Sequence, residues 1–313
     1  MKRYIITGAT GYIGSMLAER LLKEDKDVTA IVRNPERLKS SIRRKVKVFQ
    51  ADIVNQEATS QITDFYDCLI HCAAYTHSSY MISNPVEVAE SIVNGTQNML
   101  KLAVRCRVKS MVYLSSMEVY GKIDCSSDRR IGEDELGDLD ISNIRSCYPM
   151  AKRMAENFCH LYYSEYGVPV KIARLAQTFG RGVPPGDKRV FAQFAESVRN
   201  NTDIVLHTKG NSVGNYCDID DVIDAILFLS KYGESAQAYN IVNEANTMTI
   251  REMAELVSKK ISGGKIKVTY DIPYDNRFGY AVETGLRLSG AKMKELGWES
   301  KTDLEEMYRR MLT

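Results

Sequence analysis

The segment CYPMAK, at positions 147–152, places Tyr148 and Lys152 four residues apart. On a helix, this spacing brings both side chains to one face. A tyrosine has an ordinary pKa of about 10, so it accepts a proton near neutral pH only where positive charge stabilises the phenolate. Lys152 could supply that charge, which predicts proton transfer at a hydroxyl group. Because the chain contains 18 tyrosines, the spacing could also arise by chance, and other motifs must support it.

A second group of reactive side chains lies in YLSSMEVYG, at 113–121, directly after an apolar run. Ser115 and Ser116 supply hydroxyls, and Glu118 supplies a carboxylate two residues later. The apolar run predicts a buried strand, and ligands bind beyond the carboxyl ends of strands in open α/β sheets. Glu118 either acts on a substrate, as a base or an orienting group, or accepts hydrogen bonds from backbone N–H groups of its own turn.

A glycine-rich loop, TGATGYIG at 7–14, joins the first predicted strand to the first predicted helix. Glycine lets the backbone approach a pyrophosphate closely, and the start of the helix offers unpaired N–H groups to the phosphates. A strand before the loop and a helix after it turn a weak motif into a specific one. The loop therefore predicts dinucleotide binding by Gly8, Thr10, Gly11, Tyr12, Ile13 and Gly14.

The end of the second predicted strand indicates which dinucleotide is bound. A site for NAD often has an acidic residue there to accept a hydrogen bond from the ribose 2′-OH. This chain has Arg33 and Asn34 instead, and a guanidinium suits a 2′-phosphate. NADP is therefore favoured over NAD, unless Arg33 is only a solvated surface residue. The other predicted cofactor contacts lie at the ends of the third and fourth strands and are Asp52, Ile53, Ala73 and Ala74.

Strand and helix patterns alternate along the first half of the chain, which predicts an α/β fold with a doubly wound parallel sheet and right-handed crossovers. The predicted strands are 3–7, 27–33, 45–52, 67–74, 109–116 and 170–176, and the long helices are 85–106 and 148–166. The second half begins with a Pro/Gly-rich loop at 179–189. We expect a helix at 190–201, a strand at 203–207 and a turn at 208–215 after it. A further helix follows, with Asp218 or Asp220 as its N-cap.

Two domains follow from this pattern. The dinucleotide-binding domain is expected at 1–175, with a returning segment near 214–243. A smaller C-terminal α/β lobe for the substrate is expected at 176–213 and 244–313.

Bulk composition excludes several classes of function. The 313 residues include 42 basic and 40 acidic side chains, so the net charge of +2 gives no argument for binding nucleic acid or a membrane surface. The chain has no apolar run of about 18 residues, and its N-terminal apolar run is too short for a signal peptide. Seven scattered cysteines and four histidines show no ligand spacing. We expect a cytoplasmic protein with free thiols and no metal.

Together, the motifs TGATGYIG, HCAA, VNGTQNML, LSSMEVYG, RSCYPMAK and ARLAQTFGRG resemble the extended short-chain dehydrogenase/reductase family, in its nucleotide-sugar epimerase/dehydratase branch. The resemblance covers nearly the whole chain and implies a Rossmann-type fold. It also implies that Tyr148 is the acid/base at the oxidised sugar hydroxyl. Lys152 would bridge Tyr148 to the nicotinamide ribose, and Ser116 would be the strand hydroxyl, with Ser115 as the alternative.

Within that branch, RSCYPMAKRMAE and DKRVFAQF resemble the decarboxylases that act on UDP-glucuronate and the related 4,6-dehydratases. In the dehydratases an Asp-Glu pair follows the catalytic hydroxyl, where the Asp protonates the departing water and the Glu removes the C5 proton. This chain has Met117-Glu118, so the acid is missing. The arginine that often contacts the nucleotide pyrophosphate is also missing from GNYCDIDD. The residues that could replace it are Arg181, Lys188, Arg189 and Arg287, and the full set of predicted substrate contacts is Thr76, Ser115, Ser116, Met117, Gln177, Arg189 and Arg287.

Four functions are compatible with these residues. An epimerase that transiently oxidises a nucleotide-linked sugar at C4 is the leading hypothesis, because it needs only Ser116, Tyr148 and Lys152. A dehydratase or decarboxylase would also use Glu118. An NADPH-dependent keto-sugar reductase is favoured by Arg33. An NADP-sensing regulatory protein is the non-enzymatic alternative, and a sensor has no need of a base.

A homodimer is expected, because the two long helices carry apolar residues beyond one stripe. These residues are Met99, Leu102, Met154, Phe158 and Leu161. The alternative is that all of them fill the core of a single chain.

Overall fold

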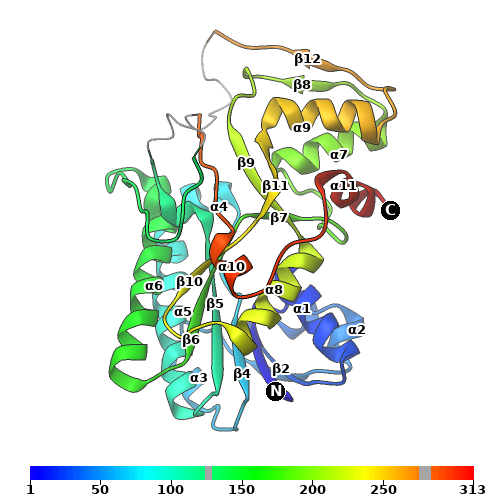
Figure 1. Ribbon diagram of the computed structural model, residues 1–313. Coiled ribbons are helices and arrows are strands. Elements are labelled where there is room, and N and C mark those ends of the chain that lie inside the picture. Colours follow the sequence, from blue (N-terminus) through cyan, green and yellow to red (C-terminus); the bar gives the residue numbers. More distant parts are fainter. Residues whose placement is uncertain (124–128, 275–282) are drawn as a thin grey trace. The chain divides into compact units, whose positions relative to one another are not determined.

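The structure, a computed structural model, describes residues 1–123, 129–274 and 283–313 (Figure 1). The chain forms two compact units. Unit 1 comprises Met1–Gly121, Leu136–Leu175 and Ile223–Tyr239, and unit 2 comprises Lys122–Glu135, Ala176–Val222 and Asn240–Thr313.

These bounds differ from the predicted domains in two places. Lys122–Glu135 belongs to unit 2, whereas it was expected in the dinucleotide-binding domain. The returning segment is Ile223–Tyr239 and not 214–243, because Val213–Asp218 pairs within a separate sheet of unit 2.

A seven-stranded sheet organises unit 1, with the order β10-β6-β5-β4-β1-β2-β3. Its strands are β1 (Arg3–Thr7), β2 (Asp27–Val32), β3 (Lys47–Gln50), β4 (Cys68–His71), β5 (Ser110–Ser116), β6 (Val170–Leu175) and β10 (Ala238–Ile241). All pairs from β3 to β6 are parallel. The predicted fold class is therefore confirmed. The chain reverses direction across the sheet between β1 and β4, which is where such folds bind dinucleotides.

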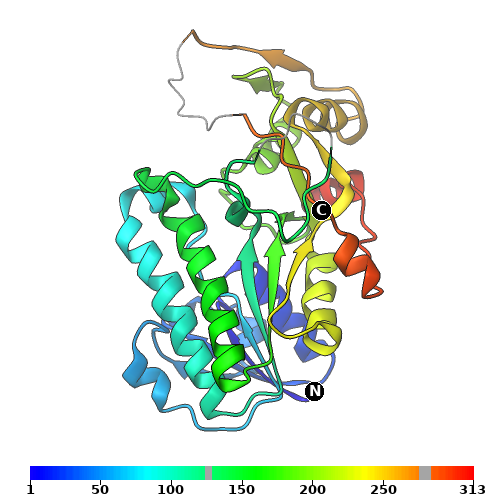
Figure 2. The same ribbon diagram turned by 60° about the vertical axis from the view of Figure 1, so that its left-hand side comes forward.

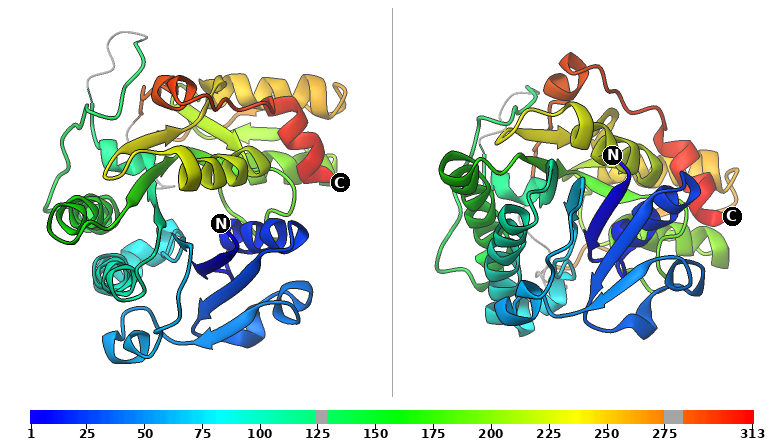
Figure 3. Two further views of the ribbon diagram at one scale, coloured as in Figure 1. Left: turned by 60° about the horizontal axis from the view of Figure 1, so that its bottom comes forward. Right: turned by 90° about the horizontal axis from the view of Figure 1, so that it is seen from below.

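Helices cover both faces of this sheet. Those with residues in unit 1 are α1 (Tyr12–Lys23), α2 (Ser40–Arg43), α3 (Gln56–Ser60), α4 (Ser78–Ser83), α5 (Pro85–Arg105), α6 (Cys147–Tyr166) and α8 (Ile219–Tyr232), with 3₁₀ turns η1 (Pro35–Arg37), η2 (Met117–Tyr120) and η3 (Ile144–Ser146). Figures 2 and 3 show α5 and α6 side by side along one face, with α1 on the other. The central strands β1, β4 and β5 are largely buried, which explains why their sequences are rich in apolar residues, whereas the edge strand β3 is partly exposed.

The long helices divide their apolar residues between the core and the surface. Met99 and Leu102 are fully buried in the core of unit 1. Phe158 is partly buried against the same core. Met154 and Leu161 are exposed by 41% and 48%. The first two residues therefore belong to the core of the chain and give no support to a second apolar face.

Unit 2 contains a three-stranded sheet of order β11-β9-β7 and a two-stranded sheet β12-β8. Its elements are β7 (Gln177–Phe179), α7 (Val190–Asn200), β8 (Ile204–Leu206), β9 (Val213–Asp218), β11 (Asn243–Thr249), α9 (Ile250–Leu256), the π-helical turn η4 (Val257–Ile261), β12 (Val268–Tyr270), α10 (Ala291–Glu295) and α11 (Leu304–Leu312). Stacked rings of Phe179 and Phe191, with centroids 4.3 Å apart, lie in its core.

Two local predictions in the second half were wrong. Residues from Val213 onward form β9, where a turn was expected, because the strand is fixed by pairing with β7 and β11. Strand β10 was not predicted; it is four residues long and lies at the sheet edge. Within the described ranges, no helix is long and apolar enough to cross a bilayer.

Candidate active site

Tyr148 and Lys152 lie in the first two turns of α6, and both are buried, with 5% and 3% of their surface exposed. The Lys152 ammonium donates a hydrogen bond to the carbonyl oxygen of Leu114 at 2.7 Å. It also lies 5.8 Å from the centroid of the Tyr148 ring and 4.8 Å from that of Tyr113. The spacing on the helix thus brings a phenol and an ammonium together against the carboxyl end of β5.

The two serines of β5 have different partners. Ser116 is close enough to the Tyr148 phenol to lower its pKa, and the Ser116 Oγ accepts the backbone N–H of Glu118 at 3.2 Å. Ser115 is 4% exposed and donates to Oε1 of Glu156 at 2.5 Å. Both serines thus meet α6, Ser116 near Tyr148 and Ser115 at Glu156, two turns further along the helix. Because the Ser115 hydroxyl is bound inside unit 1, its predicted contact with the substrate has less support than that of Ser116.

Burial sets the protonation of the pair. It raises the pKa of Tyr148, and the Glu118 carboxylate raises it further, while the Ser116 hydrogen bond and Arg145 act in the opposite sense. Burial lowers the pKa of Lys152 to about 8, against the effect of nearby Glu156. At neutral pH the phenol is therefore protonated and the lysine is mainly cationic.

Glu118 lies in η2, directly after β5, and its carboxylate is bound by an arginine. Nη2 of Arg145 donates to both carboxylate oxygens, at 3.0 and 2.9 Å. Burial raises the pKa of Glu118, and Arg145 lowers it. The alternative in which the carboxylate accepts backbone N–H groups of its own turn is not what the structure shows. Met117, beside it, carries no proton to donate.

Arg145 was not identified from the sequence. It belongs to η3, and its guanidinium lies 5.8 Å from the centroid of the Tyr148 ring. The available signal was a basic residue three positions before the tyrosine in RSCY. That signal is weak, because the same spacing occurs on many helix surfaces.

The glycine loop has the geometry of a phosphate cradle. Gly8 has φ of +73°, and a Cβ there would lie 2.8 Å from the backbone nitrogen of Ala73. A Cβ on Gly14 would lie 2.2 Å from the carbonyl oxygen of Gly8. Gly11 is the N-cap of α1 and provides no side-chain cap, so the first N–H groups of the helix are available to an anion. The residues present therefore fit a dinucleotide.

Arg33 is held by the segment that follows β4. Its Nη1 donates to the Tyr75 hydroxyl at 2.5 Å, and its guanidinium lies 5.2 Å from the centroid of that ring. Tyr75 in turn donates to Glu87 at 2.6 Å, and Asp52 lies 4.0 Å from Arg33. Arg33 is therefore not a freely solvated arginine, although its side chain is 53% exposed.

The other predicted cofactor contacts have local roles as well. Asn34 accepts the backbone N–H of Glu36 and caps η1. Asp52 accepts the N–H of Val54. Ile53 is buried, and Ala73 donates its N–H to Thr7. Thr10, Tyr12, Ile13 and Ala74 are partly buried.

Most predicted substrate contacts outside β5 lie in unit 2. Gln177 begins β7, and Arg287 is partly buried beside Leu288. Arg189 binds Asp187, with the closest atoms 2.5 Å apart. Thr76, in unit 1, is exposed just before α4. Arg181 binds Asp220 at 2.6 Å, and Lys188 is exposed.

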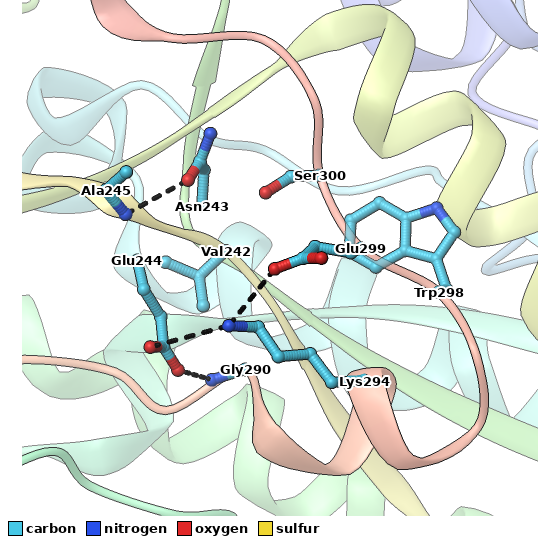
Figure 4. Close-up of a pocket in the computed structure, with 9 residues that line it drawn as sticks. All are labelled: Val242, Asn243, Glu244, Ala245, Gly290, Lys294, Trp298, Glu299 and Ser300. Atoms are coloured by element: carbon cyan, nitrogen blue, oxygen red, sulfur yellow. Dashed lines mark hydrogen bonds and ion pairs between the residues drawn. The ribbon is translucent and has the colours of Figure 1, made fainter.

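A pocket of about 110 Å³ lies within unit 2 (Figure 4). Lys294 crosses it, with Nζ 3.2 Å from Glu299 and 3.9 Å from Glu244. Its full lining is Val242, Asn243, Glu244, Ala245, Gly290, Lys294, Trp298, Glu299 and Ser300. None of the predicted site residues lines it, and it is smaller than the roughly 300 Å³ of small ligand sites. No group of three or more metal-ligating side chains occurs among the residues that the structure describes.

Comparisons with known proteins give a consistent result. Residues 4–243 match the NAD dependent epimerase/dehydratase family. UDP-glucuronic acid decarboxylase 3 of Arabidopsis thaliana is 28% identical over 306 residues, covering 97% of this chain and 86% of that protein. The dTDP-D-glucose 4,6-dehydratase of Dictyostelium discoideum is 28% identical over 254 residues, which cover 77% of this chain and 58% of that protein.

Solved structures share the fold. UDP-glucose 4-epimerase of Thermotoga maritima, with UDP-glucose, has a TM-score of 0.83 at 23% identity and covers 99% of this chain and 97% of that one. The dTDP-glucose 4,6-dehydratase DesIV of Streptomyces venezuelae, with NAD and TYD bound, has a TM-score of 0.80 at 22% identity and covers 99% and 95%. The family expected from the motifs is confirmed: the chain belongs to the NAD dependent epimerase/dehydratase family and is an enzyme of the extended short-chain dehydrogenase/reductase type.

Proposed function

We propose that this enzyme oxidises a nucleotide-linked sugar transiently at C4 and reduces the resulting keto-sugar again after it has reacted. The observation that carries the proposal is the position of the Lys152 ammonium, which lies 5.8 Å from the centroid of the Tyr148 ring and donates to the Leu114 carbonyl of β5, the strand that ends with Ser116. This arrangement holds a proton acceptor, a hydroxyl and a positive charge at one edge of the sheet.

Each of the candidate catalytic residues would have its own role in the oxidation at C4. Ser116 and Tyr148 would hydrogen-bond the C4 oxygen, and Tyr148, after releasing its own proton to solvent, would take the hydroxyl proton as the C–H bond breaks. Because burial raises the pKa of Tyr148, the cationic Lys152 is needed to stabilise the phenolate. A bound dinucleotide supplies the hydride acceptor, and the loop Gly8–Gly14 would hold its pyrophosphate.

The fate of the keto-sugar distinguishes two candidate reactions. Epimerisation, the leading hypothesis from the sequence, needs only Ser116, Tyr148 and Lys152. The Glu118–Arg145 pair beside Tyr148 favours decarboxylation of a uronate as the second candidate. In that reaction the C5–C6 bonding electrons move toward the C4 ketone, carbon dioxide leaves, and C5 then takes a proton. Dehydration has less support, because Met117 supplies no proton to the departing water.

One assay separates these reactions. The purified protein is incubated with UDP-glucose, UDP-N-acetylglucosamine, UDP-glucuronate or dTDP-glucose, without added reductant, and products are identified by NMR and mass spectrometry. A C4 epimer supports epimerisation, whereas carbon dioxide and a pentose product support decarboxylation. In a parallel incubation with NADPH, stoichiometric consumption of the NADPH would indicate a reductase. No turnover of any sugar would favour the sensor and contradict the proposal.

We further propose NADP as the preferred cofactor. Arg33 already places a guanidinium beside Asp52 and Tyr75 at the end of β2, where a 2′-phosphate would be bound. NAD is the alternative.

A homodimer through α6 is also proposed. Met150, Met154 and Leu161 are 38%, 41% and 48% exposed and follow one another along that helix. Light scattering that gives a mass near 35.3 kDa, the mass of one chain, at micromolar concentration would contradict a dimer. The six described cysteines are free, as a reducing compartment favours, and the cytoplasm therefore remains the proposed location.

A further inference from the structure

We propose that Glu156 and Arg174 are positioning residues, which fix Ser116 and Lys152 against Tyr148 through a buried network. The inference rests on the proposed C4 oxidation. Both side chains are 5% exposed, and both lie in unit 1.

The network forms a regular series of contacts between α6 and β5. Tyr148, Lys152 and Glu156 follow one another at intervals of four residues, so they lie on one face of α6. Tyr148 contacts Ser116, and Lys152 donates to the Leu114 carbonyl at 2.7 Å. Glu156 accepts from Ser115 at 2.5 Å. The contacts at Leu114 and Ser115 lie before Ser116 along β5, further from its carboxyl end. They therefore fix the register of α6 against the end of the strand.

Arg174 completes the network from the neighbouring strand. It is the register partner of Ser115 in the parallel pair β5–β6. Its Nη2 donates to Oε2 of Glu156 at 2.8 Å, and its Nε lies 3.1 and 3.2 Å from the two carboxylate oxygens. Nη1 donates to the hydroxyl of Tyr120 at 3.1 Å. Tyr120 belongs to η2, which also carries Glu118, so one ion pair connects β5, β6, α6 and η2.

The energetics argue that the pair is kept for geometry and not for stability. Each buried charge costs several kcal/mol of desolvation, and apolar residues of similar volume are often equally stable in its place. An ion pair that adds little to the free energy of unfolding still allows only one packing of the elements that carry it, because each buried charge must contact its partner. At this position the imposed arrangement is that of the strand end and the helix that carry Ser116, Tyr148 and Lys152.

Glu156 also contributes charge. Burial lowers the pKa of Lys152, and Glu156 is the foremost of the groups that oppose this effect, ahead of Cys72, Cys159 and Glu118. Loss of the carboxylate would therefore let Lys152 lose its proton at a lower pH.

The test uses three variants of the full-length enzyme with bound cofactor. These are Glu156→Gln, Ser115→Ala and the apolar double variant Glu156→Leu/Arg174→Met. The readouts are unfolding temperature, cofactor Kd, and the rate of cofactor reduction on mixing with the nucleotide sugar that wild type turns over. Lys171→Met is the matched control, because Lys171 is another buried cation of β6 and donates to Ser110 at 3.0 Å.

We expect Glu156→Gln and Ser115→Ala to slow cofactor reduction by about tenfold or more, since small displacements of reacting groups can cost up to about 10²-fold. The cofactor Kd of both variants should stay within about twofold of the wild-type value. In the pH profile of the reduction rate, the alkaline limb of Glu156→Gln should move to lower pH, because Lys152 loses its proton there. The double variant should recover stability without recovering rate. Lys171→Met should lose stability only.

Recovery of both stability and rate in the double variant would overturn the proposal, because the pair would then be structural only. If none of the nucleotide sugars tested causes wild type to reduce its cofactor, the proposed function fails, but the proposal for Glu156 and Arg174 can still be tested. The network is then tested by NMR of carbon-13-labelled tyrosine, with Tyr148→Phe for assignment. A changed chemical shift of the Tyr148 ring at neutral pH in Glu156→Gln, but not in Lys171→Met, supports positioning, and an unchanged one contradicts it.

Discussion

Nη2 of Arg145 lies 2.9 and 3.0 Å from the two carboxylate oxygens of Glu118, and the same guanidinium lies 5.8 Å from the centroid of the Tyr148 ring. The acid/base candidate at C4 and the carboxylate candidate at C5 therefore share one positive neighbour. Any change at Arg145 should alter both the basicity of Glu118 and the field at Tyr148.

Tyr148→Phe should abolish turnover while leaving cofactor Kd nearly unchanged. The phenol provides the proton path, and general acid–base groups contribute typically about 10²–10⁴-fold. Lys152→Met should impair both turnover and cofactor binding, since it is also expected to contact the ribose. Steady-state kinetics and cofactor titration measure the two effects, and normal turnover by Tyr148→Phe would show that another base carries the reaction.

Glu118→Gln should permit the first hydride transfer and block the steps at C5. Reduced-cofactor absorbance should therefore accumulate when the variant is mixed with substrate. If Glu118 is the base at C5, wild type in deuterated water should incorporate deuterium into the sugar and the variant should not. Turnover of wild type without deuterium incorporation would mean inversion at C4 or simple reduction, and Glu118 would then be at most a substrate ligand.

Arg145→Gln should shift the pH profile of the C5 steps. Burial raises the pKa of Glu118 and Arg145 lowers it, so removal of the guanidinium raises that pKa further. A base works above its pKa, and the acidic limb should consequently move to higher pH. Arg309→Gln, which removes an exposed ion pair with Glu305 on α11, is the control and should leave the profile unchanged. An unmoved limb in Arg145→Gln would argue against Glu118 as the titrating group.

Arg33→Ala should weaken NADP binding by about tenfold or more and NAD binding much less, because a charge-assisted contact contributes about 1.5–3 kcal/mol. Isothermal titration of both cofactors measures the difference. Arg43→Ala, which removes an exposed arginine paired with Glu36, serves as the control. Equal NADP affinity in Arg33→Ala and wild type would remove Arg33 from the site.

Asp218→Asn should stabilise the protein at pH values well above 6. Burial raises the pKa of Asp218 from 3.8 to about 6, and no described group bonds to its Oδ2. A carboxyl with a raised folded pKa stabilises the fold below its unfolded pKa, and this contribution disappears as pH rises through about 6. The corresponding free energy is at most about 3 kcal/mol. Unfolding temperatures on both sides of pH 6 test this, with the exposed Asp271→Asn as control; an equal effect at every pH would contradict it.

Much of the site was predictable because its signals are local. Gly8, Gly11 and Gly14 are specified by a tight turn at the start of a helix, and Tyr148 and Lys152 by helical periodicity. The parallel sheet followed from alternating apolar runs for the same reason. These features depend on residues only a few positions apart, and they could therefore be predicted from the sequence alone.

Other features depend on which segments meet in space. The Ser115 hydroxyl binds Glu156, 41 residues away, and no local pattern indicates this contact, which distinguishes Ser115 from Ser116. Arg145 pairs with Glu118 across 27 residues, and no periodicity marks that contact. Likewise, β9 exists because β7 and β11 supply its hydrogen bonds. Periodicity reports the face that a residue presents along its own element, whereas an ion pair or a strand pairing depends on the packing of two elements, and only the tertiary structure decides that.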